Sequence, residues 1–270
     1  MQRNGFYYLG VMLFLQFSIL NAQANTTDLA KDATSMTIAK NQELLNILPF
    51  SDRQSFKNAD RGFIAPLPDK GIIKDADGQN VWDSSEFAFI EKHTEAPNTV
   101  NPSLWRQSQL IVKAGLFRVT DAIYQVRGMD LSNITFIEGK NGIIIVDPLV
   151  STETAQAALN FYYQHRPKKP VVAVIYTHSH VDHYGGVRGV IDEKDTDDGK
   201  VKVVAPEGFM QAAVAENVMA GNAMSRRATY MYGNLLPPSP KGQVGAGLGL
   251  TTSSGTVSLI QPTDIISKNE

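Results

Sequence analysis

Short apolar runs separated by brief polar breaks dominate the chain between residues 115 and 147. Four of these runs are rich in β-favouring side chains and predict strands: Leu116–Val119, Ile123–Arg127, Ile134–Glu138 and Gly142–Asp147. The Asn141-Gly142 dipeptide is typical of a hairpin turn, so we expect an antiparallel meander. The last run contains Ile143-Ile144-Ile145-Val146, which is wholly apolar and therefore predicts a central strand.

The pattern then changes to helical spacing and back again. Ser151 is a suitable cap for a helix to about His165, whose predicted inner face carries Ala155, Ala158, Leu159 and Tyr162. The run Val171–Tyr176 is unbroken, apolar and β-branched, which predicts a strand buried on both faces. Val201–Ala205 predicts another buried strand. A meander followed by this strand–helix–strand order predicts a mixed α/β (α+β) fold.

The first part of the chain has weaker patterns. Residues 25–40 are polar and predict a loose leader, and Gln42–Leu48 predicts a short helix that ends before Pro49. Residues 48–53 and 61–66 mix proline, glycine and charge with isolated apolar residues, so we expect both segments to wrap over a core built elsewhere. Asp77-Gly78 predicts a turn and Val81-Trp82 a short strand.

The last part is predicted as follows. Val187–Ile191 continues as a short helix, and residues 192–200 form a solvated loop. Pro206 occupies the first turn of a helix over residues 207–220. Residues 233–255 are rich in glycine and proline, and we expect a loop that covers the functional site. Thr256–Ile260 predicts a strand.

The first 24 residues have the pattern of an export signal. Arg3 is followed by a mostly apolar stretch over residues 6–20 and by Ala22-Gln23-Ala24, a typical cleavage site. The stretch is short for a membrane span, so a retained anchor is the minor alternative. We therefore expect three parts: a signal peptide (1–24), a wrapping extension (25–100) and a catalytic domain (101–270). The mature protein is expected in the periplasm or outside the cell.

The amino-acid composition excludes several classes of function and of metal site. The 270-residue chain is 43% hydrophobic, with a formal net charge of −2, which gives no electrostatic basis for binding nucleic acid. The chain has no cysteine, so disulfides, thiolate nucleophiles and cysteine zinc sites are excluded. Any metal ligand must be histidine, aspartate or glutamate.

The largest cluster of potential metal ligands follows the predicted strand that ends near Tyr176. His178, His180 and Asp182 alternate, so they would point to one side of an extended segment. His183 breaks the alternation and requires a turn, and Gly185-Gly186 allows close backbone approach. Four ligands from two directions suit two metal ions better than one closed site. Imidazole and carboxylate ligands favour zinc over manganese or iron.

Other candidates are weaker. Asp147 is the last residue of the predicted strand Gly142–Asp147. It could either orient a ligand histidine or be an ordinary turn residue. Tyr232 and Asn234, with Tyr230, are candidates for a substrate pocket, and Arg226 and Arg227 could meet an anionic group. Packed tyrosines and surface arginines are the commoner case. His93 and His165 are expected to be structural, and Glu207 and Glu216 to be helix-surface charges.

The motif His178-x-His180-x-Asp182-His183, with Asp147 and Gly185-Gly186, resembles the metallo-β-lactamase superfamily. Five further segments resemble, in order, the alkyl sulfatases that hydrolyse detergents such as dodecyl sulfate. They are Leu48–Arg53, Ser103–Gln107, Ile123–Gly128, Asp130–Asn133 and Tyr230–Pro237. The resemblance covers nearly all of the chain after residue 45.

The resemblance implies a binuclear zinc hydrolase with an αββα sandwich fold. His178 and His180 would bind the first zinc ion, and Asp182 and His183 the second. The catalytic group would be a water held by the metals, with Asp182 as the candidate side chain. The substrate would be a small alkyl sulfate ester, and full-length members of the family are homodimers.

The chain departs from the family at its end. Family members continue for hundreds of residues and draw further glutamate and histidine ligands from beyond the point matching Glu270. We therefore expect an N-terminal portion with an incomplete sandwich, a half-built site and an uncovered apolar face. The alternatives are another hydrolase of the superfamily, acting on a lactam, thioester or phosphoester, and a non-catalytic metal-binding fragment.

Overall fold

The computed structural model describes residues 30–268, and the chain from Lys31 onward groups into one compact unit. The predicted signal peptide and residues 25–29 of the predicted leader lie outside the described residues. Within the described part, no helix has the length and apolarity that a membrane span requires. The predicted division near residue 100 stays a prediction.

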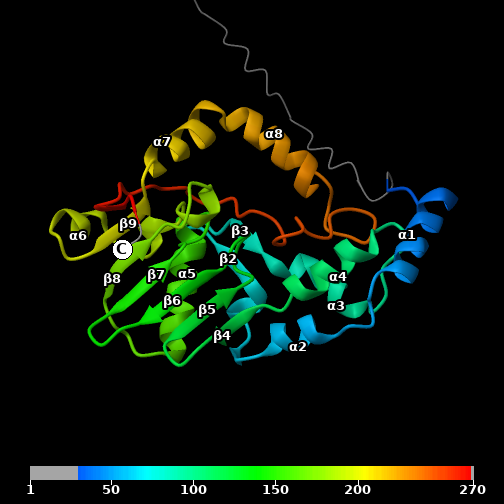
Figure 1. Ribbon diagram of the computed structural model, residues 1–270, viewed down its shortest axis with the longest axis horizontal. Helices are drawn as coiled ribbons and strands as arrows, with labels where there is room; N and C mark the ends of the chain where they lie inside the picture. Colours follow the sequence, from blue (N-terminus) through cyan, green and yellow to red (C-terminus); the bar gives the residue numbers. More distant parts are fainter. Residues whose placement is uncertain (1–29, 269–270) are drawn as a thin grey trace, which may run out of the picture. The chain divides into compact units, whose positions relative to one another are not determined.

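A mixed sheet of eight strands forms the centre of this unit (Figure 1). In sheet order the strands are β1 (Phe63–Ala65), β4 (Gly115–Arg118), β5 (Ile123–Arg127), β6 (Ile134–Glu138), β7 (Ile143–Val146), β8 (Val171–Ile175), β9 (Lys202–Pro206) and β10 (Asp264–Ile266). Strands β1 to β7 pair antiparallel, and β7 to β10 pair parallel. The predicted meander, the central position of β7 and the mixed α/β class are confirmed. A separate hairpin pairs β2 (Ile72–Lys74) with β3 (Asn80–Asp83), which confirms the turn at Asp77-Gly78 and the strand at Val81-Trp82.

Helices flank the sheet. The α-helices are α1 (Ser35–Ile47), α2 (Gln54–Asp60), α3 (Phe89–Lys92), α4 (Pro102–Ile111), α5 (Thr152–His165), α6 (Glu193–Asp197), α7 (Phe209–Val214) and α8 (Gly221–Tyr232). Short 3-10 turns are η2 (Pro68–Gly71), η3 (Ser84–Phe87), η4 (Val181–His183) and η5 (Val187–Gly189), and η6 (Ala215–Met219) is a π-helix. Helix α5 begins after its predicted cap Ser151, whose hydroxyl accepts from the Thr154 amide.

One face of the sheet carries the core. A cross-strand row of five side chains, all at most 3% exposed, runs along it: Tyr124, Phe136, Ile145, Val174 and Val203. Helix α5 packs on this row, with Tyr162 stacked on Phe136 at 4.3 Å between ring centroids. The predicted inner face of α5 is confirmed, because Ala155, Ala158, Leu159 and Tyr162 are all buried.

The opposite face is only half covered. The neighbouring row contains Val146, Ile175 and Val204, all of intermediate exposure. In β8, Val174 is buried but Val172 is 36% exposed. The prediction that this strand is buried on both faces is therefore wrong, because α5 covers only the face that carries Val174.

The first part of the chain is more ordered than its pattern predicts. Residues 35–40 belong to α1, whose first turn is capped by the Thr34 side chain, so the loose leader is wrong there. The helix predicted over residues 42–48 is the second half of α1; because α1 buries no residue, no apolar periodicity indicated that it begins at Ser35. Helix α2 lies between the two predicted wrapping segments, and the second segment contains β1, which extends the sheet by pairing with β4.

The region after β9 also differs from expectation. Pro206 ends β9 rather than opening a helix, and Gly208 in the left-handed region starts the turn into α7. The helical path continues through η6 and α8 to Tyr232, twelve residues beyond its predicted end at 220, and Gly233 terminates it with φ +65°. Helix α8 buries none of its residues, so its packing against the rest of the chain does not explain where it ends.

Three smaller predictions need correction. Residues 256–260 form no strand; instead Thr256 and Ser258 bond to the backbone of Thr152 and Gly185, and β10 forms later. The predicted solvated loop at 192–200 contains α6, capped by Asp192. The helix predicted over 187–191 is a single 3-10 turn.

Candidate metal centre

The motif residues lie at the edge of the sheet where β7 and β8 both end. Strand β8 stops at Ile175, and the Asp147 amide, just after β7, donates to the Ile175 carbonyl at 3.0 Å. His178 and His180 lie in irregular backbone, and Asp182 and His183 in the 3-10 turn η4. The predicted extended alternation therefore does not extend through the motif, although the predicted turn at His183 is present.

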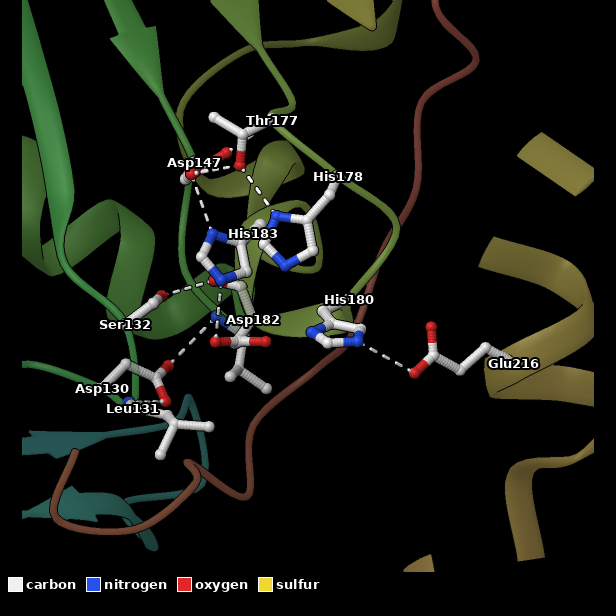
Figure 2. Close-up of polar contacts among 11 residues, drawn as sticks. Asp130, Leu131, Ser132, Asp147, Thr177, His178, His180, Asp182, His183 and Glu216 are labelled. Carbon is white, nitrogen blue, oxygen red and sulfur yellow. Dashed lines mark hydrogen bonds and ion pairs between the residues drawn. The ribbon is translucent and has the colours of Figure 1, made fainter. Parts of the chain in front are cut away.

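The three imidazoles nevertheless gather in one place, as Figure 2 shows. The ring centroids of His178 and His183 are 4.1 Å apart, and those of His178 and His180 are 4.7 Å apart. Asp182 lies beside them, with one carboxylate oxygen 3.1 Å from Nε2 of His183. The loop therefore brings together all four predicted ligands.

His183 lies between two carboxylates. Its Nδ1 is 2.8 Å from Oδ2 of Asp147, and its Nε2 faces Asp182. Burial opposes protonation, but the hydrogen bonds and charges of the two carboxylates raise the pKa of His183 to about 9. The same negative charge would favour a divalent cation at Nε2. The Asp147 contact has the form of the carboxylate–histidine pairs that orient metal ligands.

Asp147 also holds the start of the motif loop. Its two carboxylate oxygens accept from the Thr177 amide at 2.9 Å and the Thr177 hydroxyl at 2.8 Å. The Thr177 hydroxyl is in turn 3.0 Å from Nδ1 of His178. Burial and the positive charges of His183 and His180 lower the pKa of His178, which favours the neutral imidazole that binds metals.

One contact of His180 was not predicted from the sequence. Nε2 of His180 lies 3.3 Å from Oε1 of Glu216, which comes from the π-helix η6 (Figure 2). Glu216 is thus more than the helix-surface charge that was predicted. The side chain of Asn217 adds a 3.4 Å bond to the Ser179 carbonyl. No local pattern could have found these pairs, because 36 residues separate Glu216 from His180. Glu207 is exposed, as predicted.

The chemistry of these donors fits a divalent cation: three imidazoles, an acidic partner and a carboxylate behind one ring. The number of converging donors is lower than a complete site needs. Within residues 30–268, no three histidine, aspartate or glutamate side chains are arranged to hold one ion. Asp182 and His183 form the best-placed pair of donors, and Asp147 already supports their imidazole.

Gly185 and Gly186 let the motif turn lie against the segment after β7. A β-carbon on Gly185 would lie 2.1 Å from the Val150 carbonyl oxygen, and one on Gly186 would lie 2.2 Å from that of Pro148. The predicted need for close backbone approach at these positions is confirmed.

The weaker candidates are spread over the end of α8. Tyr232 is half-buried, and burial, followed by the negative charge of Asp182, raises its pKa, so its hydroxyl lies within the electrostatic reach of the site. Asn234, Arg226 and Arg227 are exposed, and Tyr230 is 91% exposed. His93 and His165 are exposed as well, away from the motif.

Comparison with known proteins agrees with this geometry. The model of the metallo-beta-lactamase superfamily matches residues 127–258, which include Asp147 and the whole motif. Residues 127–258 of this chain belong to the metallo-β-lactamase superfamily. The predicted resemblance is confirmed.

Several relatives of this chain are named as alkylsulfatases. The chain is 66% identical over 248 residues to a linear primary-alkylsulfatase of Pseudomonas sp. and 53% identical over 244 residues to an alkyl/aryl-sulfatase of Saccharomyces cerevisiae. It aligns with the structure of the inverting sec-alkylsulfatase Pisa1 from Pseudomonas sp. with a TM-score of 0.84 and 52% identity, over 88% of this chain. The matched regions span only 37–38% of these three relatives. The fold of this superfamily and the similarity to enzymes of sulfate esters are thereby established, and the superfamily implies metal ions at the motif.

Proposed function

We propose that this chain carries the metal-binding part of a binuclear zinc alkyl sulfatase. The reaction is hydrolysis of a linear alkyl sulfate ester, such as dodecyl sulfate, by one water molecule to an alcohol and sulfate. His178 and His180 would hold one zinc ion, and Asp182 and His183 the other. When bound, the zinc ions supply positive charge that activates water and offsets the charge of the sulfate group.

The observation that carries the proposal is the placement of His183 between Asp147 and Asp182. Two carboxylates within 3.1 Å of one imidazole make this point of the chain strongly favourable for positive charge. His178 and His180 lie next to it with their rings 4.7 Å apart.

The choice of substrate follows from the relatives and from one residue. Those relatives are named for primary alkyl, alkyl/aryl and secondary alkyl sulfates. Tyr232 is half-buried, and burial, followed by the negative charge of Asp182, raises its pKa; its ring is the candidate for a wall of the substrate pocket. Asn234 would lie further out, since it is exposed.

Two further properties are part of the proposal. Export to the periplasm or the medium rests on Arg3, the apolar stretch 6–20 and Ala22-Gln23-Ala24. Homodimerisation rests on the resemblance to full-length alkyl sulfatases.

The experiment compares the purified chain, its His183→Ala variant and the His93→Ala variant as matched control. Bound zinc is counted by mass spectrometry, and sulfate release from dodecyl sulfate is measured beside turnover of a chromogenic lactam. We expect bound zinc in the parent and the control, a loss of about tenfold or more of this zinc in His183→Ala, and sulfate release only in the chains that hold zinc.

Each other outcome selects an alternative. Turnover of the lactam without sulfate release would support another hydrolase of the superfamily. Zinc binding with neither activity at any zinc load would support a non-catalytic metal-binding fragment. Equal zinc content in His183→Ala and the parent would contradict the metal site itself.

A further inference from the structure

Asp130 is a buried carboxylate outside the proposed ligand set, and it sits directly beneath the motif (Figure 2). Only 3% of the residue is exposed. One carboxylate oxygen accepts from the amides of Leu131 (2.8 Å) and Ser253 (3.1 Å). The other accepts from the Val150 amide (3.2 Å) and from the hydroxyls of Thr154 and Ser253, both at 2.7 Å.

These five bonds join three segments that are distant in sequence. They are the turn after β5, the junction between β7 and α5, and the glycine-rich segment that returns at Ser253. Burying a carboxylate is costly unless its hydrogen bonds are satisfied, so a carboxylate with five donors marks a position where the chain is held firmly.

The first route from Asp130 to the motif runs through Val150. The segment from Asp147 to Val150 is strained, because Asp147 has φ +56° and the fully buried Leu149 has φ +63°. Non-glycine residues adopt this region only where the surroundings fix it. The bond from the Val150 amide to Asp130 fixes one end of the strained segment, and Asp147 at its other end holds His183.

The second route runs through Ser132. The Leu131 amide bond sets the turn that follows Asp130, and the Ser132 hydroxyl donates to the backbone carbonyl of Asp182. This contact fixes the residue whose carboxylate lies next to His183. Asp130 therefore supports both carboxylates that flank His183: Asp147 through Val150, and Asp182 through Ser132.

We propose that Asp130 is a positioning residue for the proposed metal site: it holds the carboxylates of Asp147 and Asp182 in place beside His183, at 2.8 and 3.1 Å from its two ring nitrogens. The inference builds on the proposed function, because it concerns the same site. A carboxylate that served only the fold would stabilise the chain without changing the affinity for metal.

The test measures the Kd for zinc in the full 270-residue chain by competition with a chelator, together with the melting temperature. Variants are Asp130→Ala, Asp130→Asn and Ser253→Ala. The matched control is Glu138→Ala, because Glu138 also accepts three hydrogen bonds, from Tyr162 and Arg166, but lies away from the motif. The signal of the His183 Nδ1 proton in nitrogen–proton NMR spectra reports the contact with Asp147 directly.

Asp130→Ala is expected to weaken zinc binding about tenfold or more, the range for residues that orient ligands, and to broaden or shift the His183 signal. Asp130→Asn keeps one accepting oxygen but turns an N–H group toward a donor, so a smaller loss is expected. Ser253→Ala removes one hydroxyl and leaves the Val150 bond, so its zinc affinity should stay close to that of the parent. Glu138→Ala should lower the melting temperature with zinc affinity and the His183 signal unchanged.

If both Asp130 variants lower the melting temperature but keep the parent's zinc affinity and His183 signal, Asp130 is merely structural and the inference is wrong. That result is distinct from failure of the proposed function, in which His183→Ala itself leaves zinc binding unchanged. An Asp130→Ala chain that does not fold leaves the decision to Asp130→Asn, whose zinc affinity then supports or contradicts the inference.

Discussion

At the scale of single residues, the site depends on how closely two backbone segments approach. Asp147 reaches His183 and Thr177 because the motif turn lies directly against the Pro148–Val150 segment. Gly186 makes this possible: its φ is −89°, so the position needs the absence of a side chain rather than an unusual conformation.

Replacing Gly186 with alanine should therefore push the two segments apart. The new methyl group would meet the carbonyls of Pro148 and Ser151 and the Ala155 side chain, all within 2.6 Å. We expect a loss of about 1–3 kcal/mol in unfolding free energy, the usual cost of overpacking, and weaker zinc binding. Chemical denaturation and zinc titration measure the two effects.

Gly221→Ala is the control for this substitution. Nothing lies within 4 Å of a β-carbon at Gly221, which begins helix α8. Alanine there should be neutral or slightly stabilising. Equal stability of the two variants would contradict the close-approach argument.

At the scale of elements, helix α5 is fastened to the sheet by an ion pair as well as by packing. Glu138, at the end of β6, accepts from Arg166 at 2.7 and 3.0 Å and from the Tyr162 hydroxyl at 2.7 Å. Arg166 lies just after the last residue of α5 and also covers the Tyr124 ring at 4.4 Å. The hydrogen bonds from Arg166, opposed by burial and assisted by Tyr162, lower the pKa of Glu138.

This shift predicts a dependence of stability on pH. A carboxyl whose pKa is lower in the folded than in the unfolded state stabilises the fold above the unfolded pKa, and the contribution is lost as pH falls through the folded pKa. Glu138→Gln should cost about 1–2 kcal/mol at pH 7, and the difference from the parent should shrink below about pH 4.5.

Thermal unfolding of both chains across this pH range measures the effect. The exposed Glu91 provides the control, since Glu91→Gln should leave stability unchanged at each pH. A constant gap between Glu138→Gln and the parent down to strong acid would contradict the role of the ionised Glu138.

At the scale of the whole molecule, apolar surface is concentrated on the segment from η6 to residue 236. Six of its side chains are more than half exposed: Val218, Met219, Tyr230, Met231, Leu235 and Leu236. The half-covered face of the sheet adds Val172 at 36% exposure. Exposed apolar surface of this extent favours association in water. The sequence predicted an uncovered face on the strands, to which Val172 belongs, but not the exposed helical segment.

The chain should therefore self-associate as its concentration rises. The double variant Met219→Lys with Leu235→Lys should shift the balance toward monomer, since these side chains are 83% and 80% exposed. Met36→Lys, at an equally exposed position (76%) on α1, is the control. Light scattering after size-exclusion chromatography measures the mass, and an unchanged mass in the double variant would contradict the prediction.

The sequence by itself determined the central sheet, helix α5 and the proposed ligands, because these depend on local patterns. Alternating or continuous apolar runs specify β4 to β9 within a residue or two, and Ser151 specifies the start of α5. His178, His180, Asp182 and His183 lie within six residues, so any turn after β8 brings them together.

Only the tertiary structure decided what packs around them. Helix α1 buries no side chain and has almost no apolar periodicity, and the single covered face of β8 depends on where α5 lies. Glu216 reaches His180 across 36 residues, and Asp130 meets Ser253 across 123. Contacts over such distances arise from the path of the whole chain, which no local spacing of residues encodes.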